Sequence, residues 1–240
     1  MKNFLKGFAL AVSMMTSVPF FKVHDFNKGI NGYAVLFYPL VGFLLGLILY
    51  GVYSLLEGHL PDLHLGIIIF ALWVILTGAL HLDGFSDTID GLFVSKERAL
   101  EVMKDPNTGG MGMTFTVTFL ILKASSLAVF DDFYLLPVVL LLSRFNVVLA
   151  IYIFPYISKG GMGTLAKEEL KSSQVFTALM YITILSISTL GLFLLSLVVL
   201  FLIKTFFVRR YGGFTGDIYG FSIEVTELVL LNAILLGIVV

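Results

Sequence analysis

Residues 65–80 read LGIIIFALWVILTGAL, and residues 81–91 continue directly as HLDGFSDTIDG. The first stretch is apolar and close to the length of about 20 residues that a helix needs to cross a bilayer. The second stretch contains three carboxylates, Asp83, Asp87 and Asp90, at successive offsets of four and three residues. At about 100° per residue, these side chains fall within roughly 60° of one another on a helix. An apolar span is therefore followed at once by an acidic helical stripe.

This acidic stripe predicts a cation site. Like charges on one helical face repel one another, so the arrangement is costly unless a cation lies between them. Clustered oxygen ligands suit Mg²⁺ or a similar divalent ion bound to phosphate, and Gly84 and Gly91 permit close approach of a ligand. The motif therefore indicates phosphoryl chemistry at a membrane surface. The alternative is a solvated acidic helix end.

The composition indicates a membrane protein. Of the 240 residues, 58% are hydrophobic and 13% are charged, whereas a soluble domain is about 25% charged. The net charge of −1 provides no basic field for nucleic acid, and the absence of cysteine excludes disulfides and thiolate chemistry. We expect one polytopic domain over residues 1–240, without a cleavable signal.

Further apolar runs predict an all-α bundle of membrane-spanning helices. The clear runs are 34–56, 65–80, 114–130, 134–157 and 219–240. Residues 173–207 form either one long helix or a hairpin that turns near Ser188–Gly191. Lys and Arg concentrate within 2–28, 96–104, 159–171 and 204–210, and the positive-inside rule makes all four segments cytoplasmic. Only a hairpin keeps the last two on one side, so we expect about seven spans, with six as the alternative.

This topology gathers distant segments on the cytoplasmic face, where we expect the active site. They are the acidic motif 81–91, the loop through residue 112, the Gly-rich segment 158–164 and the segment 209–217.

Two of these segments combine glycines with charge. Residues 103–112, MKDPNTGGMG, predict a turn-rich loop whose N–H groups and Lys104 could bind phosphate. The loop lacks the P-loop pattern, and an ordinary interhelical loop is the alternative. Residues 209–217, RRYGGFTGD, predict a second close-approach turn that ends in Asp217. In the alternative interpretation, Arg209 and Arg210 only set the topology.

Charged side chains also occur inside the expected spans. They are Lys123, Arg144, Glu224 and Glu227, and such residues are costly in lipid and are functional candidates. Asp217 and Glu224 are seven residues apart and share a helical stripe. The alternative is that Lys123 and Arg144 pair with Glu224 or Glu227 inside the bundle.

Several short motifs together carry a resemblance to a known family. They are His81–Gly91, Met103–Gly109 with Gly112, Leu142–Arg144, Gly212–Asp217 with Glu224 and Glu227, Met15–Pro19 and Phe37–Gly42. With these motifs the chain resembles, over nearly its whole length, cobalamin synthase, the adenosylcobinamide-GDP ribazoletransferase family. Ser86 stands where the family often has Ala. Pro106 and Asn107 stand where Ser-Arg is frequent, which bears on how this loop contacts phosphate.

The resemblance implies a transferase of cobalamin (vitamin B12) biosynthesis. The family joins adenosylcobinamide-GDP to α-ribazole or its 5′-phosphate and releases GMP, with Mg²⁺ as cofactor, in the last assembly step of the nucleotide loop. We accordingly expect a multi-pass protein of the bacterial or archaeal cytoplasmic membrane, the inner membrane where there are two. Its expected partners are these substrates, the lipid bilayer, and a second copy or other cobalamin-assembly enzymes. The form of the acceptor, its lower-ligand base and the number of metal ions stay open.

For this reaction we assign roles to particular residues. The expected metal ligands are Asp83, Asp87, Asp90, Asp217 and Glu224. Asp90 or Asp217 would take the proton of the ribazole hydroxyl, and Lys104 and Arg144 would stabilise charge on phosphate. The expected substrate-binding residues are His81, Gly84, Gly91, Asp105, Gly109, Gly112, Gly213 and Gly216.

Two other functions begin from similar residues. CDP-alcohol phosphotransferases of lipid synthesis also carry spaced aspartates, but their motif begins Asp-Gly-x-x-Ala-Arg. Here Ser86-Asp87 follow Asp83-Gly84-Phe85, so the Ala-Arg pair is absent and the spacing is compressed. A cation transporter would place acidic residues near the bilayer midplane, in the broken helices of paired repeats. The aspartates here fall at expected span ends, and no repeat is visible.

Overall fold

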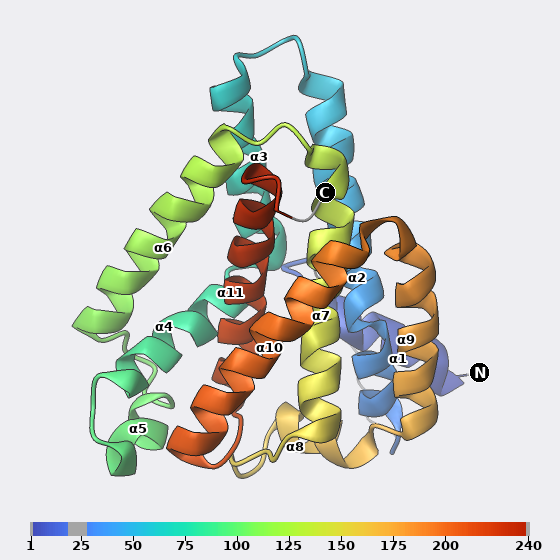
Figure 1. The fold of residues 1–240 in the computed structure, drawn as a ribbon. Coiled ribbons are helices and arrows are strands. Elements are labelled where there is room, and N and C mark those ends of the chain that lie inside the picture. The colour runs from blue at the N-terminus through green and yellow to red at the C-terminus, as the bar shows by residue number, and fades with distance from the viewer. Residues whose placement is uncertain (1, 19–27, 239–240) are drawn as a thin grey trace.

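The computed structural model describes residues 2–18 and 28–238. Over these residues the chain is an all-α bundle (Figure 1). Its helices are α1 Lys2–Met15, α2 Ile30–Leu56, α3 Asp62–Thr77, α4 Leu80–Leu92, α5 Lys96–Val102, α6 Gly110–Ala128, α7 Leu136–Ile153, α8 Met162–Glu169, α9 Ser172–Leu185, α10 Leu190–Tyr211 and α11 Gly216–Leu235, with two 3₁₀ turns, Phe133–Leu135 and Ile187–Thr189. Lys22 of the first basic segment and Pro19 of a family motif lie outside the described residues.

Within residues 2–18 and 28–238, five helices are long and apolar enough to span a membrane, namely α2, α6, α7, α10 and α11. The helices α3 and α4 pass the same test only as a pair, bent by 85°. The expected seven spans are therefore wrong, and the alternative of six holds only if this bent pair counts as one crossing. The chain does turn at Ile187–Thr189, close to the expected hairpin. However, α9 has 14 residues, fewer than the approximately 17 that a crossing needs.

The bend before the acidic motif arises from two residues in the left-handed backbone region. Gly78 has φ 60° and Ala79 has φ 55°, and Ala79 is the one described non-glycine residue with positive φ. This conformation costs an L-residue about 1–2 kcal/mol. It sends α4 away from the axis of α3, so that α4 lies along α11. The acidic motif thereby lies beside a second helix.

Close helix contacts at glycines build the centre of the bundle. Gly42 and Gly46 on α2 lie directly against the backbone of α7, as expected where small residues let membrane helices approach each other. The same device joins α4 to α11, because a Cβ on Gly84 would lie 2.9 Å from the Asp217 carbonyl oxygen. At the same interface, Gly220 of α11 lies close to the backbone of α4, because a Cβ on Gly220 would lie 3.0 Å from the His81 carbonyl oxygen.

A buried network of charges ties α6, α7 and α11 together. Lys123 Nζ lies 2.7 Å from Glu224 Oε2 and 2.6 Å from Glu227 Oε2, while Arg144 Nη1 pairs with the second oxygen of Glu227. These four side chains are at most 4% exposed. The alternative in which Lys123 and Arg144 pair with the glutamates inside the bundle is therefore confirmed.

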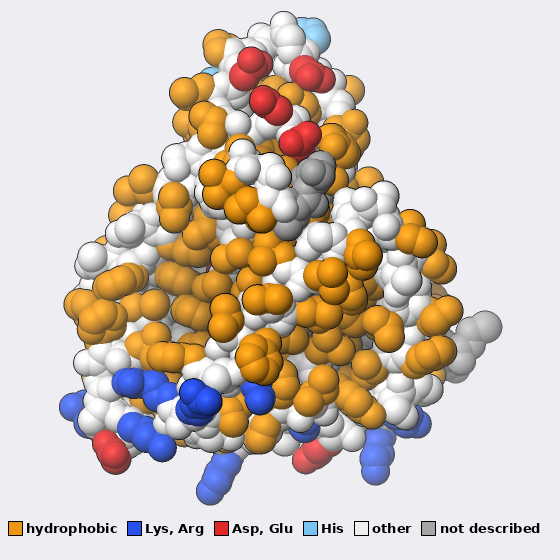
Figure 2. Space-filling view, in the orientation of Figure 1, with side chains coloured by type: hydrophobic (Ala, Val, Ile, Leu, Met, Phe, Trp, Pro, Cys, Tyr) orange, Lys and Arg blue, Asp and Glu red, His pale blue; other side chains and the backbone are white. Residues whose placement is uncertain are grey.

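Charge separates toward the two ends of the bundle (Figure 2). Lys and Arg side chains gather at the end where α5, α8 and the end of α10 lie, at the bottom of the view. Acidic side chains gather at the opposite tip, where the connections α2–α3 and α6–α7 contain Glu57, Asp131 and Asp132. Hydrophobic side chains cover the surface between the two ends.

Candidate active site

Three carboxylates lie within electrostatic reach of one another where α4 lies against the first turn of α11. Asp83 is exposed, and Asp87 and Asp217 are partly exposed. Burial, followed by the negative charges of Asp83, Asp217, Asp90 and Asp105, raises the pKa of Asp87 to about 7. Here α4 is a short amphipathic helix outside the five spans. The expected repulsion between acidic side chains is thus present, and Asp217, 134 residues beyond Asp83 in sequence, contributes to it.

Asp90 has a different environment from the other aspartates. Its Oδ2 accepts a hydrogen bond from the Gly109 N–H at 2.7 Å, and its Oδ1 accepts one from the Gly112 N–H, also at 2.7 Å. The residue is 8% exposed. Asp90 therefore holds the amino-terminal end of α6, where unpaired N–H groups favour a carboxylate, and both of its oxygens are occupied.

The hydrogen bonds of Asp90 also fix the end of the segment 103–112, which the sequence predicts to be a phosphate-binding loop. The helix α6 begins at Gly110, so the expectation that the loop continues to Gly112 is wrong for its last residues. The helix starts early because the Asp90 carboxylate accepts hydrogen bonds from the N–H groups of Gly109 and Gly112. Lys104 is exposed and lies within electrostatic reach of Asp217.

Within this loop, Asp105 stabilises a turn. Its carboxylate accepts hydrogen bonds from Asn107 N at 2.9 Å and from Asn107 Nδ2 at 2.8 Å, and these bonds lower the pKa of Asp105. Asn107, one of the two departures from the family pattern, therefore has a local role in the turn.

The turn before α11 positions Asp217. Gly212 has φ 87°, which favours glycine. Phe214 N donates to the Pro155 carbonyl oxygen at 2.8 Å, and the Phe214 carbonyl oxygen accepts from Ile157 N at 2.9 Å. Thr215 caps α11 by accepting from Ile218 N at 3.3 Å.

Three further hydrogen bonds stabilise this turn, and two of them join it to α4. Thr215 Oγ1 donates to Asp217 Oδ2 at 3.2 Å. At the end of α10, Arg210 Nη2 donates to the Leu92 carbonyl oxygen at 3.0 Å, and Tyr211 Oη donates to the Gly91 carbonyl oxygen at 2.9 Å. Arg210 therefore caps α4, where a cation interacts favourably with the carboxyl end of a helix.

The remaining residues assigned from sequence have mostly packing contacts. Gly91 lies against Met103, and a Cβ on Gly213 would meet the Pro155 carbonyl oxygen at 2.5 Å. Gly216 faces open space. Arg144 and Glu224 are buried ion-pair partners, so the structure does not present either of them beside the three accessible carboxylates.

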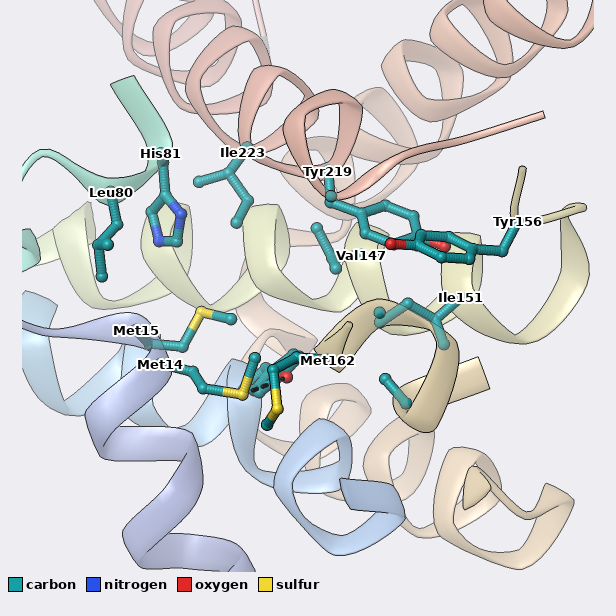
Figure 3. A pocket seen from close by; sticks show the side chains of 15 residues that line it. Met14, Met15, Leu80, His81, Val147, Ile151, Tyr156, Met162, Tyr219 and Ile223 are labelled. Atoms are coloured by element: carbon teal, nitrogen blue, oxygen red, sulfur yellow. Dashed lines mark hydrogen bonds between the residues drawn. The ribbon is translucent and has the colours of Figure 1, made fainter. Parts of the chain in front are cut away.

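His81 lines a cavity of about 320 Å³ next to this acidic site (Figure 3). Its Nε2 atom and the hydroxyl of Tyr219 are buried without a hydrogen-bond partner in the described part of the chain. Tyr219 was not among the residues predicted from the sequence. Its position on α11, two residues after Asp217, was the available signal.

The accessible carboxylates fit a divalent cation shared with a ligand. Among the described residues, no three His, Cys, Asp or Glu side chains are arranged as a ready metal-binding group. Mg²⁺ is commonly held by only one or two carboxylates, together with water and substrate phosphates. Asp83 and Asp87 repel each other, and within the described part of the chain neither forms an ion pair with a cationic side chain, which suits that type of open site.

Comparisons with known proteins agree with one another. A model of the cobalamin-5-phosphate synthase family matches residues 7–235. The adenosylcobinamide-GDP ribazoletransferase of Desulforamulus reducens is 36% identical over 95% of both chains. That of Pseudomonas aeruginosa is 34% identical over 98% of this chain and 100% of the relative. No solved structure matches the chain. By the extent of these matches, the chain belongs to the cobalamin-5-phosphate synthase family.

Proposed function

We propose that the protein joins adenosylcobinamide-GDP to α-ribazole, or to α-ribazole 5′-phosphate, and releases GMP. The family and the activity for which its relatives are named supply the substrates. The observation that carries the proposal is that Asp83 and Asp217, from two helices, lie within electrostatic reach of Asp87, and that the exposed Lys104 lies within electrostatic reach of Asp217. Accessible carboxylates beside a lysine form a surface that suits a metal-bound diphosphate.

In this proposal Asp83 and Asp87 are the residues that would hold Mg²⁺. The ion, when bound, would neutralise phosphate charge and stabilise the departing GMP. Lys104 donates hydrogen bonds to phosphate oxygens as their charge increases. Asp105 and Asn107 keep the loop that carries Lys104 in its turn.

Asp217 is the proposed proton acceptor. A ribazole hydroxyl oxygen attacks the phosphorus that carries the cobinamide, the bond from that phosphorus to the GMP oxygen breaks, and GMP leaves with the bonding electrons. The hydroxyl proton passes to Asp217. Asp90 is less suited to this role, because both of its oxygens already accept hydrogen bonds from the backbone N–H groups of Gly109 and Gly112.

The site faces the cytoplasm in this proposal. The acidic site is built from the first turns of α4 and the start of α11, close to α5 and the basic end of the bundle (Figures 1 and 2). Basic segments remain on the cytoplasmic side of a membrane. Both nucleotide substrates would then reach the site from the compartment in which they are made.

The test is an assay of protein reconstituted in vesicles with adenosylcobinamide-GDP, α-ribazole and Mg²⁺, followed by chromatography of GMP and corrinoid product. We expect equal amounts of both products, and only with the metal. Asp83→Asn should lower turnover by several orders of magnitude. The matched control is Asp131→Asn, an exposed aspartate at the opposite tip, which should retain turnover. A fully active Asp83→Asn protein would remove this carboxylate from the mechanism.

A further inference from the structure

The cavity beside the acidic site has the shape and surface of a small-molecule site. Its volume of about 320 Å³ lies at the lower end of the range of roughly 300–1,000 Å³ for ligand pockets. It lies among α1, α2, α4, α7, α8 and α11 (Figure 3). Much of its wall consists of soft or aromatic side chains, namely Met14, Met15, Met162, Tyr38, Tyr156 and Tyr219. Thioether sulfur makes favourable contacts with aromatic rings.

Two polar atoms in this wall have no partner. His81 Nε2 and the Tyr219 hydroxyl are buried, in residues that are 6% and 7% exposed, with no hydrogen bond to any described residue. A buried polar group without a hydrogen bond destabilises the fold, so such atoms call for an explanation. A mostly apolar ligand with one or two hydrogen-bonding atoms would satisfy them.

The cavity adjoins the acidic site through α11. Gly216, Tyr219 and Gly220 line it, and Asp217 follows directly after Gly216. The Tyr156 ring stacks on the Tyr219 ring, with centroids 5.9 Å apart and an interplanar angle of 17°, and Tyr156 lies within electrostatic reach of Asp217. A ligand whose apolar end lies in the cavity can therefore present a polar end to the carboxylates.

We infer that this cavity holds the planar aromatic base of the nucleoside acceptor, with the ribose directed toward Asp217. This inference rests on the proposed ribazole transfer. The base of α-ribazole is an apolar bicyclic ring with one free ring nitrogen, which can accept a hydrogen bond from Tyr219 or from the N–H tautomer of His81. Stacking on Tyr156 or Tyr219 and contact with the methionines suit its flat faces.

The other groups in the reaction fit the cavity less well. Guanine presents several donors and acceptors along its edge, and most of them would lose water here without gaining a partner. The corrin ring with its side chains is too large for this volume. A lipid chain would fill the space but would leave His81 and Tyr219 unpaired.

The test compares two variants of the cavity with two matched controls in reconstituted protein. Tyr219→Phe removes the unpaired hydroxyl, and Tyr50→Phe makes the same change at an exposed position on α2. Val147→Phe fills the cavity, and Val198→Phe makes the same change at an exposed position on α10. The measurements are the KM for each substrate and the Kd for α-ribazole by equilibrium dialysis without corrinoid.

We expect Tyr219→Phe to raise the KM and Kd for α-ribazole between about twofold and tenfold, the effect of one net hydrogen bond. Val147→Phe should raise both by about tenfold or more, because overpacking a filled site is costly. The KM for adenosylcobinamide-GDP should not change in either cavity variant. In the two control variants, every KM and the Kd for α-ribazole should stay at the wild-type values. Tyr219→Phe removes only the hydroxyl group and keeps the ring in place. It therefore keeps the test decisive should Val147→Phe fail to fold.

Three results would overturn the inference. The first is active protein whose cavity variants leave the KM and Kd for α-ribazole unchanged, and the second is a change confined to adenosylcobinamide-GDP. The third is a co-purifying lipid that Val147→Phe displaces without any effect on α-ribazole. In contrast, wild-type protein that turns over neither substrate would refute the proposed function itself, so the two failures are distinguishable.

Discussion

Replacing Lys123 by Met tests whether the buried charge network holds the bundle together. Lys123 is the ion-pair partner of Glu224, whereas Glu227 also pairs with Arg144. The Lys123→Met protein therefore leaves Glu224 buried, 4% exposed at its side chain, without its counter-charge. Breaking a buried pair in this way costs about 3–5 kcal/mol.

A second substitution separates charge balance from lost packing. In Lys123→Met/Glu224→Gln, the uncompensated carboxylate is gone, while Arg144 still pairs with Glu227. Replacing both members of a buried pair is often close to neutral, so we expect the double variant to recover most of the stability. The control is Lys204→Met on α10, whose Nζ lies over the Phe201 ring and has no carboxylate partner among the described ion pairs.

The assay is thermal unfolding in detergent, followed by tryptophan fluorescence. The lone Trp73 is a direct probe, because Lys123 Nζ lies 4.3 Å from the centre of its ring. We expect a large fall in the midpoint for Lys123→Met and a midpoint near wild type for the double variant and for Lys204→Met. A double variant as unstable as the single one would refute the reasoning, since the loss would then come from packing rather than from an unpaired charge.

Three further outcomes follow from other contacts. Gly112→Val should lower turnover and unfold the start of α6 locally, because a side chain at this position meets the Asp90 carboxylate. Hydrogen exchange of residues 103–112 measures the local unfolding, and an unchanged exchange rate would contradict the prediction. Asp87→Asn should stabilise the fold at pH 8 but not at pH 4. The pKa of Asp87 is raised to about 7 in the folded protein and is about 4 in the unfolded chain, so wild-type stability falls as pH rises from about 4 toward 7. Equal shifts of the unfolding midpoint at both pH values would contradict this. Glu169→Ala should destabilise by about 1–3 kcal/mol at pH 7, with the effect shrinking as pH falls through the pKa. Despite burial, hydrogen bonds from Gly29, Asn31 and Gly32 lower that pKa, so denaturation curves of the variant and wild type should converge in acid.

Much of the site was predictable because it is encoded locally. The offsets of Asp83, Asp87 and Asp90 place them on one helical face whatever the rest of the chain does. Their different roles were not predictable, because Asp90 is distinguished by the N–H groups of Gly109 and Gly112. Those contacts depend on where α6 begins, which is a tertiary property.

The span count shows the same limit. Hydropathy detected the apolar residues 65–80 and 173–207, but it does not report backbone direction. The left-handed conformation at Ala79 turns the chain by 85° between α3 and α4, and no residue type at that position demands it. Similarly, Lys123 and Arg144 were intramembrane charges with two open interpretations, and only their contacts with Glu224 and Glu227 decided between them.

The position of α6 at the edge of the bundle links the active site to the surrounding lipid. Of the five spans, α6 is the least buried, so most of its length borders acyl chains. It is fastened in its interior by Lys123 and at its amino-terminal end by Asp90, directly after the loop that carries Lys104. A thinner or thicker bilayer would change the tilt of such a peripheral helix and would shift Lys104 with it. We therefore expect the turnover of the proposed reaction to change with bilayer thickness.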